Sequence, residues 1–156
     1  AVVLCAWAGR LAGGGVMRTP PSARSCRANY ACAGLEGTTA HVGGLCRFGP
    51  ASLEAARRGE PRANLPGKLG AAGPLDRLHV SGRTGWYLRV LEEGEAGANM
   101  TLDREQAGAS GISILDAYRI RTDRNASDAD LQRLMDAPGL SVGWRSSLHR
   151  RLSRAD

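Results

Sequence analysis

Residues 82–94 read GRTGWYLRVLEEG, and this stretch contains the clearest strand pattern in the chain. Aromatic and β-branched residues are typical of strands, and alternating apolar and polar side chains indicate a strand with one buried face. The alternation predicts one face made of Trp86, Leu88 and Val90 and an opposite face made of Tyr87, Arg89 and Leu91. Two glutamates and a glycine follow, so we expect a β-strand at residues 85–91 that ends in a turn at 92–94.

Shorter strand patterns lie on both sides of this stretch. Residues 1–5, 41–48 and 52–56 are expected to form strands, with Gly49-Pro50 as the turn between the last two. Residues 99–103 alternate apolar Met100 and Leu102 with polar neighbours and are predicted as the partner strand after the turn at 92–94. The chain before about residue 108 is therefore predicted to be β-rich.

From residue 111 the spacing of apolar residues changes from two towards 3.6, which indicates helices. One helix is expected around Ile114, Leu115 and Tyr118. Ser127 and Ser141 are N-cap residue types, and each precedes a further amphipathic segment. We predict that three helices between about 113 and 153 pack a small core made of Tyr118, Leu131, Leu134, Trp144 and Leu148.

Composition narrows the class of protein. The chain has 156 residues, of which 42% are hydrophobic and 23% charged, as expected for a globular domain. No apolar stretch reaches the roughly 18 residues that cross a bilayer, so a membrane-spanning protein is excluded and a cytoplasmic location is expected. The first residues lack a basic segment before their apolar run, which favours a strand over a signal peptide.

The positive charge lies in the first part of the chain. Residues 1–70 contain nine Lys or Arg against three Asp or Glu, whereas residues 71–156 contain twelve of each, which accounts for the net charge of +6. A basic region can attract phosphate or nucleic acid. Few aromatic residues lie between these arginines to stack on bases, so nucleic acid is not an expected partner.

The cysteines and histidines form no recognisable metal or nucleophile motif. Cys26, Cys32, His41 and Cys46 are soft metal-ligand types, but their spacing matches no paired zinc knuckle, so buried reduced thiols are the simpler interpretation. Gly82-Arg83-Thr84-Gly85 offers backbone amides and a guanidinium, which suit an anion, although an ordinary turn explains the same residues.

Residues 82–94 also resemble the signature segment of MOSC domains, the molybdenum cofactor sulfurase C-terminal family, in its bacterial branch with an appended three-helix domain. The tail agrees with that branch, because the family closes with a Pro-Gly-Leu-Ser turn, a Trp-Arg pair and a basic helix, similar to residues 138–152 here. Upstream, the family elements are similar to Asn29, Gly34-Leu35, Val42-Gly43, Arg47-Phe48-Gly49 and Pro61.

The resemblance implies an α+β protein made of two parts. Residues 1–108 would form a β-rich, barrel-like MOSC domain that is truncated at its N-terminus, and residues 109–156 a three-helix domain. It also implies binding of a molybdenum (molybdopterin) cofactor, with Asn29, Arg83 and Arg89 as cofactor-binding residues. Members of the family reduce N-hydroxylated bases or related compounds, so a small-molecule substrate of that kind and an electron-donor protein are the implied partners.

The chain differs from the MOSC pattern at the position of the metal ligand. The cysteine that ligates molybdenum aligns with Arg62, and a guanidinium has no lone pair to donate. The acidic residue of the Val/Ile-Gly-Asp element is replaced by Gly44, and the glutamate before Asn29 by Ala28. We therefore predict no catalytic residue and no metal ligand in this chain. The alternative function is a non-catalytic remnant or protein-interaction module.

Overall fold

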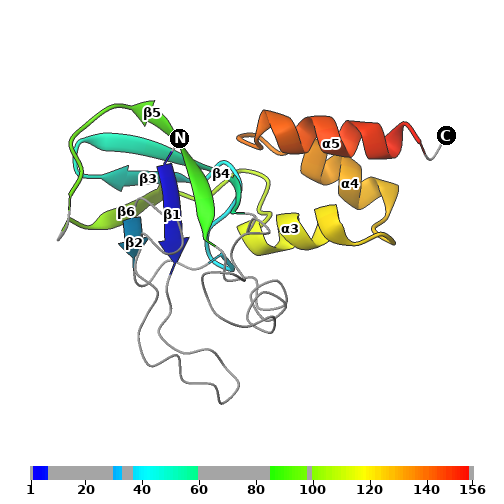
Figure 1. The fold of residues 1–156 in the computed structure, drawn as a ribbon, viewed down its shortest axis with the longest axis horizontal. Coiled ribbons are helices and arrows are strands. Elements are labelled where there is room, and N and C mark those ends of the chain that lie inside the picture. Colours follow the sequence, from blue (N-terminus) through cyan, green and yellow to red (C-terminus); the bar gives the residue numbers. More distant parts are fainter. Residues whose placement is uncertain (1, 7–29, 33–36, 60–84, 98–99, 155–156) are drawn as a thin grey trace, which may run out of the picture.

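The computed structural model describes residues 2–6, 30–32, 37–59, 85–97 and 100–154, and only the backbone of the first two segments. A curved sheet forms one end of the molecule and three helices form the other (Figure 1). The strands are β1 (Val2–Ala6), β2 (Tyr30–Cys32), β3 (Leu45–Phe48), β4 (Ala51–Arg58), β5 (Trp86–Glu92) and β6 (Leu102–Gln106). They lie in the order β2-β1-β5-β4-β3-β6, with every pair antiparallel except β1 and β2.

The β3–β4 hairpin is confirmed, and its turn lies at Gly49 and Pro50. Its first strand is shorter than expected, because residues 41–44 form a turn before β3 begins at Leu45. Gly43 has a φ of +76° in this turn, a left-handed conformation that glycine adopts without steric cost. Gly43 and Gly44, which weaken the strand pattern, therefore lie directly before the first residue of β3.

The strand predicted from residues 85–91 is β5, and its neighbours differ from those expected. β5 pairs with β1 and β4, whereas β6 pairs with β3 and begins later than predicted, at Leu102. The expected pairing of β5 with residues 99–103 is therefore wrong. The alternation of β5 holds for buried Trp86 and Leu88 but fades at Val90, which is 36% exposed because it lies near the end of the sheet.

The three predicted helices are present; Ser127 and Ser141 are N-caps as predicted, and Ser113 is a third N-cap that was not predicted. They are α3 (Ile114–Thr122), α4 (Asp128–Met135) and α5 (Val142–Leu152). The hydroxyls of Ser113, Ser127 and Ser141 accept hydrogen bonds from the backbone N–H three residues later, which satisfies a donor that the helix leaves unpaired. Among the described residues, no helix is long and apolar enough to cross a bilayer.

The core predicted for the helices exists, but it is not separate from the sheet. Leu131, Leu134, Trp144 and Leu148 are buried, and Tyr118 packs against them partly exposed. The same cluster continues into the sheet through residues of β3, β4 and β5, including Phe48, Leu53, Ala55, Trp86 and Leu88. One hydrophobic core therefore joins the two ends of the molecule seen in Figure 1.

The α4–α5 turn docks on the sheet by direct backbone contact. The Ser141 N–H donates to the carbonyl oxygen of Ala56 on β4 at 3.1 Å. A Cβ atom added to Gly43 would lie 2.4 Å from the carbonyl oxygen of Pro138, and one added to Gly139 would lie 2.4 Å from the Cα of Gly43. Two facing glycines thus let the backbone of the helical end approach that of the sheet.

Candidate functional site

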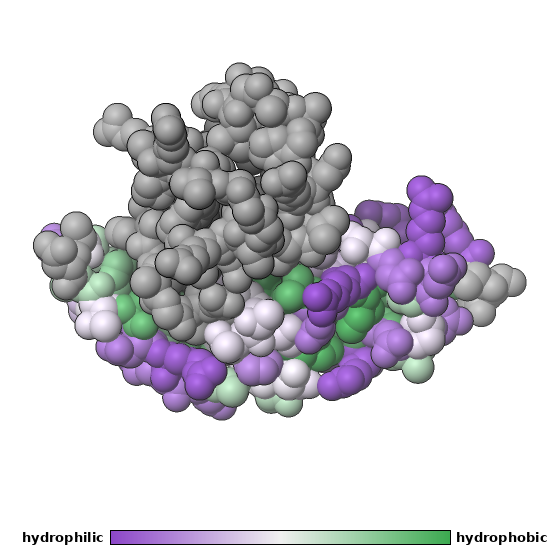
Figure 2. Space-filling model, turned by 90° about the horizontal axis from the view of Figure 1, so that it is seen from below, coloured by the Kyte–Doolittle hydropathy of each residue, from purple (hydrophilic) through white to green (hydrophobic). Residues whose placement is uncertain are grey.

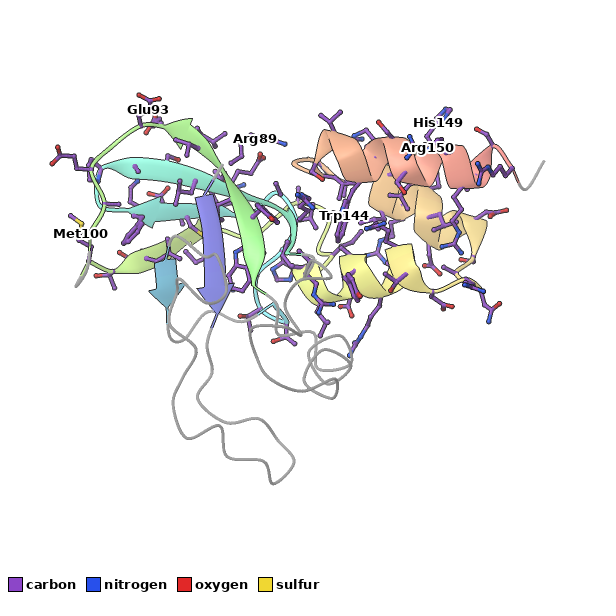
Figure 3. The ribbon with its side chains drawn as sticks, viewed as in Figure 1. Arg89, Glu93, Met100, Trp144, His149 and Arg150 are labelled. Atoms are coloured by element: carbon purple, nitrogen blue, oxygen red, sulfur yellow. The ribbon has the colours of Figure 1, made fainter. Side chains whose placement is uncertain are left out.

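Of the cofactor-binding and metal-ligand positions that the resemblance implies, Arg89 lies in the described part of the chain, whereas Asn29, Arg62 and Arg83 lie outside it. Arg89 is on β5, on the side facing the helices in Figure 3. Its guanidinium donates to the Glu54 carboxylate on β4 at 2.5 Å, and its side chain is 44% exposed. Arg89 is therefore accessible, and an acidic neighbour offsets its charge.

The structure fixes both ends of the segment that contains Arg62 and Arg83. The Gly59 N–H donates to the Gly85 carbonyl oxygen at 2.9 Å, immediately after β4 and before β5. Arg62 follows Gly59 by three residues, and Arg83 precedes Gly85 by two. Gly59 and Gly85, the described residues nearest in sequence to these two positions, thus lie side by side at the end of the β4–β5 pair.

A β-bulge at this end of β4 brings two arginines to the junction with the helices. Ala55 pairs with Leu88 and Arg57 with Tyr87, so Ala56 is the extra residue on β4. Bulges redirect neighbouring side chains. The guanidinium of Arg57 lies 4.1 Å from the centre of the Tyr87 ring, and that of Arg58, 1% exposed, lies 3.6 Å from the centre of the Tyr118 ring on α3.

The helices supply a third arginine. Arg121 follows Tyr118 by three residues on α3, a spacing that places both side chains on one helix face. Its guanidinium lies 4.8 Å from the centre of the Trp144 ring on α5. Figure 3 shows Trp144 between α5 and α3, at the helical side of the junction. We call Arg57, Arg58 and Arg121, with the rings that hold them, the arginine junction.

Burial affects two of the three guanidinium groups, and charge repulsion links Arg121 to Arg57. Burial lowers the pKa of Arg58, an effect that Tyr118 partly opposes. Burial is also the main cause that lowers the pKa of Arg121, and the positive charge of Arg57 lowers it further. Like charges held close together in a partly buried site attract a counter-anion.

Few of the groups described at the junction can accept a hydrogen bond. Arg57 has no carboxylate partner in the part of the chain that the structure describes. The buried indole N–H groups of Trp86 and Trp144 have no hydrogen-bond partner there either. Guanidinium and indole N–H groups are donors only, so the arrangement favours an acceptor-rich anion such as a phosphate or a carboxylate.

These residues fit one part of a molybdopterin cofactor and not the other. The arginines fit its phosphate, and the aromatic rings offer faces for a flat ring system. For the metal, the described segments contain no group of three His, Cys, Asp or Glu side chains that could hold an ion. Cys46, whose side chain lies in the core on β3, is 4% exposed. The arginine junction therefore suits the phosphate and the ring, without protein ligands for molybdenum.

The arginine junction was not predicted from the sequence. Arg57 and Arg58 form a pair at the end of an apolar strand, just before Gly59, and this pair is the only local signal. Their proximity to Arg121 depends on the bulge and on the packing of α3 against β4, which residue spacing does not reveal. Seen from below, hydrophilic surface lies over the helical end, beside smaller apolar patches (Figure 2).

Known proteins share sequence and fold with this chain. Residues 112–155 match the family model described as YiiM-like, 3-alpha helix domain. The uncharacterized protein YflK of Bacillus subtilis is 29% identical over 126 residues, which are 81% of this chain and 57% of YflK. Protein YiiM of Escherichia coli is 23% identical over 123 residues, 79% of this chain and 54% of YiiM. The chain thus spans little more than half of these relatives.

Solved structures agree at the level of the fold. YiiM from Geobacillus stearothermophilus superposes with a TM-score of 0.85 at 22% identity, over 97% of this chain and 78% of that one. YiiM from E. coli gives a TM-score of 0.77 at 22% identity, over 83% and 64% of the two chains. Residues 112–155 therefore match a YiiM-like three-helix domain, and the chain as a whole shares the fold of the YiiM structures.

Proposed function

We propose that the chain binds the phosphate-bearing pterin part of a molybdenum cofactor at the arginine junction and does not reduce N-hydroxylated compounds. The observation that carries this proposal is that Arg57, Arg58 and Arg121 lie against the rings of Tyr87, Tyr118 and Trp144 where the end of the β4–β5 pair meets the helices. The resemblance of residues 82–94 to MOSC domains supplies the class of cofactor.

The arginine junction offers an anion partial shielding from water in addition to positive charge. Arg57 and Arg121 are half-buried, so a phosphate held by them would be partly shielded from water, where charge-assisted hydrogen bonds gain strength. Arg58 is too deeply buried to serve as an exposed ligand, and it adds positive potential beneath the site. The Tyr87 ring is half-buried, with the Arg57 guanidinium over one face, and the proposal places the pterin on the other face.

The proposal is tested by calorimetric titration of the protein with a pterin phosphate and with inorganic phosphate. Arg57→Gln removes one charge and its N–H donors, and we expect it to weaken binding of both by about tenfold to a hundredfold, as for the loss of a charge-assisted hydrogen bond worth about 1.5–3 kcal/mol. The matched control is Arg47→Gln, which removes an arginine from β3 that pairs with Glu92 and Glu105. The control should bind like the wild type.

Two results would contradict the proposal. The first is a wild-type protein that binds neither ligand, which would favour the interaction-module alternative. The second is equal weakening in Arg57→Gln and Arg47→Gln, since this would show a general effect of net charge and not a site at the arginine junction.

A further inference from the structure

We propose that the three-helix domain is part of the anion site, with Arg121 as a direct ligand of the bound phosphate, held in place by Trp144 and Arg151. This inference rests on the proposed function, because it assigns a specificity-determining residue to the same site. It gives the helical end of the molecule a role in binding in addition to packing.

The position of Arg121 is the first argument. It lies one turn beyond Tyr118, whose ring carries the guanidinium of Arg58, and it is close enough to Arg57 for the two charges to interact. Arg57 comes from β4 and Arg121 from α3, so an anion between them would be held from two sides by two elements. Two guanidinium groups that approach from different elements are a common arrangement for phosphate, which has several acceptor oxygens.

The second argument is that α5 fixes the end of α3 on which Arg121 lies. Arg151 donates from one guanidinium nitrogen to the carbonyl oxygen of Arg121 at 3.3 Å and from another to that of Arg124 at 2.9 Å. Trp144, also on α5, is 3% exposed and presents its ring to the Arg121 guanidinium. A cation held over a buried ring loses rotamer freedom before any ligand arrives, which lowers the entropic cost of binding.

The third argument is that α5 is itself anchored to the strand that carries Arg57. Ser141, the N-cap of α5, donates its backbone N–H to Ala56, the bulged residue directly before Arg57. The distance between Arg57 and Arg121 is therefore set by a short path through Ala56, Ser141 and Trp144. The bulge at Ala56, the hydrogen bond from Ser141 and the contact of Trp144 with Arg121 together position the two arginines.

Calorimetry with inorganic phosphate tests the inference. We expect Arg121→Gln to weaken phosphate binding by at least about tenfold, as for the loss of one charge-assisted contact. The matched control is Arg119→Gln on the same helix, which removes an exposed arginine paired with Asp116 at 3.2 Å and should change the affinity less than about twofold. Wild-type affinity in Arg121→Gln, together with weakened binding in Arg57→Gln, would overturn the inference and leave the proposed function standing. No binding by the wild type would overturn both.

A second measurement on the wild-type protein does not depend on whether the variants fold. Phenylglyoxal modifies accessible arginines, and mass spectrometry reports the rate at each position. Phosphate should slow the modification of Arg121 and Arg57 and leave that of Arg119 unchanged. Equal rates at Arg121 with and without phosphate, under conditions where Arg57 is protected, would overturn the inference.

Discussion

Arg57 and Arg89 differ in what surrounds them, although both are arginines on neighbouring strands. Tyr87 and Arg89 are two residues apart on β5 and so share a face, which places Arg89 beside the ring that Arg57 covers. The charge of Arg89 is offset by Glu54, whereas Arg57 faces an aromatic ring and another cation. We therefore assign the larger share of anion binding to Arg57 and keep Arg89 as a proposed contact at the edge of the site.

By the resemblance to MOSC domains, Arg62 stands at the position of the cysteine that ligates molybdenum. Its guanidinium stays protonated near neutral pH and has no lone pair, so it balances an anionic charge and does not coordinate a metal. We expect the purified chain to contain no stoichiometric molybdenum and to leave N-hydroxylated bases unreduced. Arg62→Cys alone should not restore turnover, because Ala28 and Gly44 also differ from the family pattern.

Elemental analysis and a reductase assay of the native and Arg62→Cys proteins check this prediction. One molybdenum atom per native chain, with turnover of an N-hydroxylated base, would mean that the family cysteine does not align with Arg62.

Strands and helices could be predicted from the sequence where the residues of one element are sufficient to determine its structure. The strand at 85–91 and the N-cap serines before α4 and α5 depend on local geometry, and the structure has each of them, although the alternation of buried and exposed residues in β5 ends after Leu88. The predicted partner of β5 was wrong because strand pairing depends on residues far away in the chain. The edge of β5 expected to pair with residues 99–103 pairs instead with β4, a longer and more apolar strand. The arginine junction was missed for the same reason, since it needs a bulge and a helix from another region.

Glycine contributes to the contact between the α4–α5 turn and the turn before β3 through its left-handed backbone and through its lack of a Cβ atom. Gly111, outside this contact, separates the two effects. Gly43 and Gly111 both have positive φ, at 76° and 64°. A Cβ at Gly43 would collide with the backbone of Pro138, whereas one at Gly111 would meet nothing within 4 Å. We expect Gly111→Ala to lower the free energy of unfolding by about 1–2 kcal/mol through left-handed strain alone, and Gly43→Ala to lower it further.

Denaturant unfolding of the two variants measures this difference. If Gly43→Ala costs no more than Gly111→Ala, the close backbone approach does not contribute to docking of the helices on the sheet.

The molecule as a whole has one hydrophobic core, and Trp144 connects its two ends. The indole is buried in the cluster that includes Leu131 and Leu148, and it also carries Arg121. Trp144→Ala should lower the free energy of unfolding by about 3–5 kcal/mol, because it empties a large buried volume. Since the core is continuous, sheet and helices should unfold in a single transition in the wild type.

Chemical denaturation followed by circular dichroism and by tryptophan fluorescence checks both statements. A loss below about 0.5 kcal/mol, the range of surface substitutions, would contradict the packing of Trp144. Two separate transitions in the wild type would contradict a shared core.

A crystal structure of the protein grown with a pterin phosphate tests the central claim most directly, since it locates the anion. We expect the phosphate to lie between Arg57 and Arg121, with oxygens about 2.7–2.9 Å from both guanidinium groups, and the pterin to extend over Tyr87. A phosphate bound elsewhere, or an arginine junction that stays empty at saturating ligand, would contradict it.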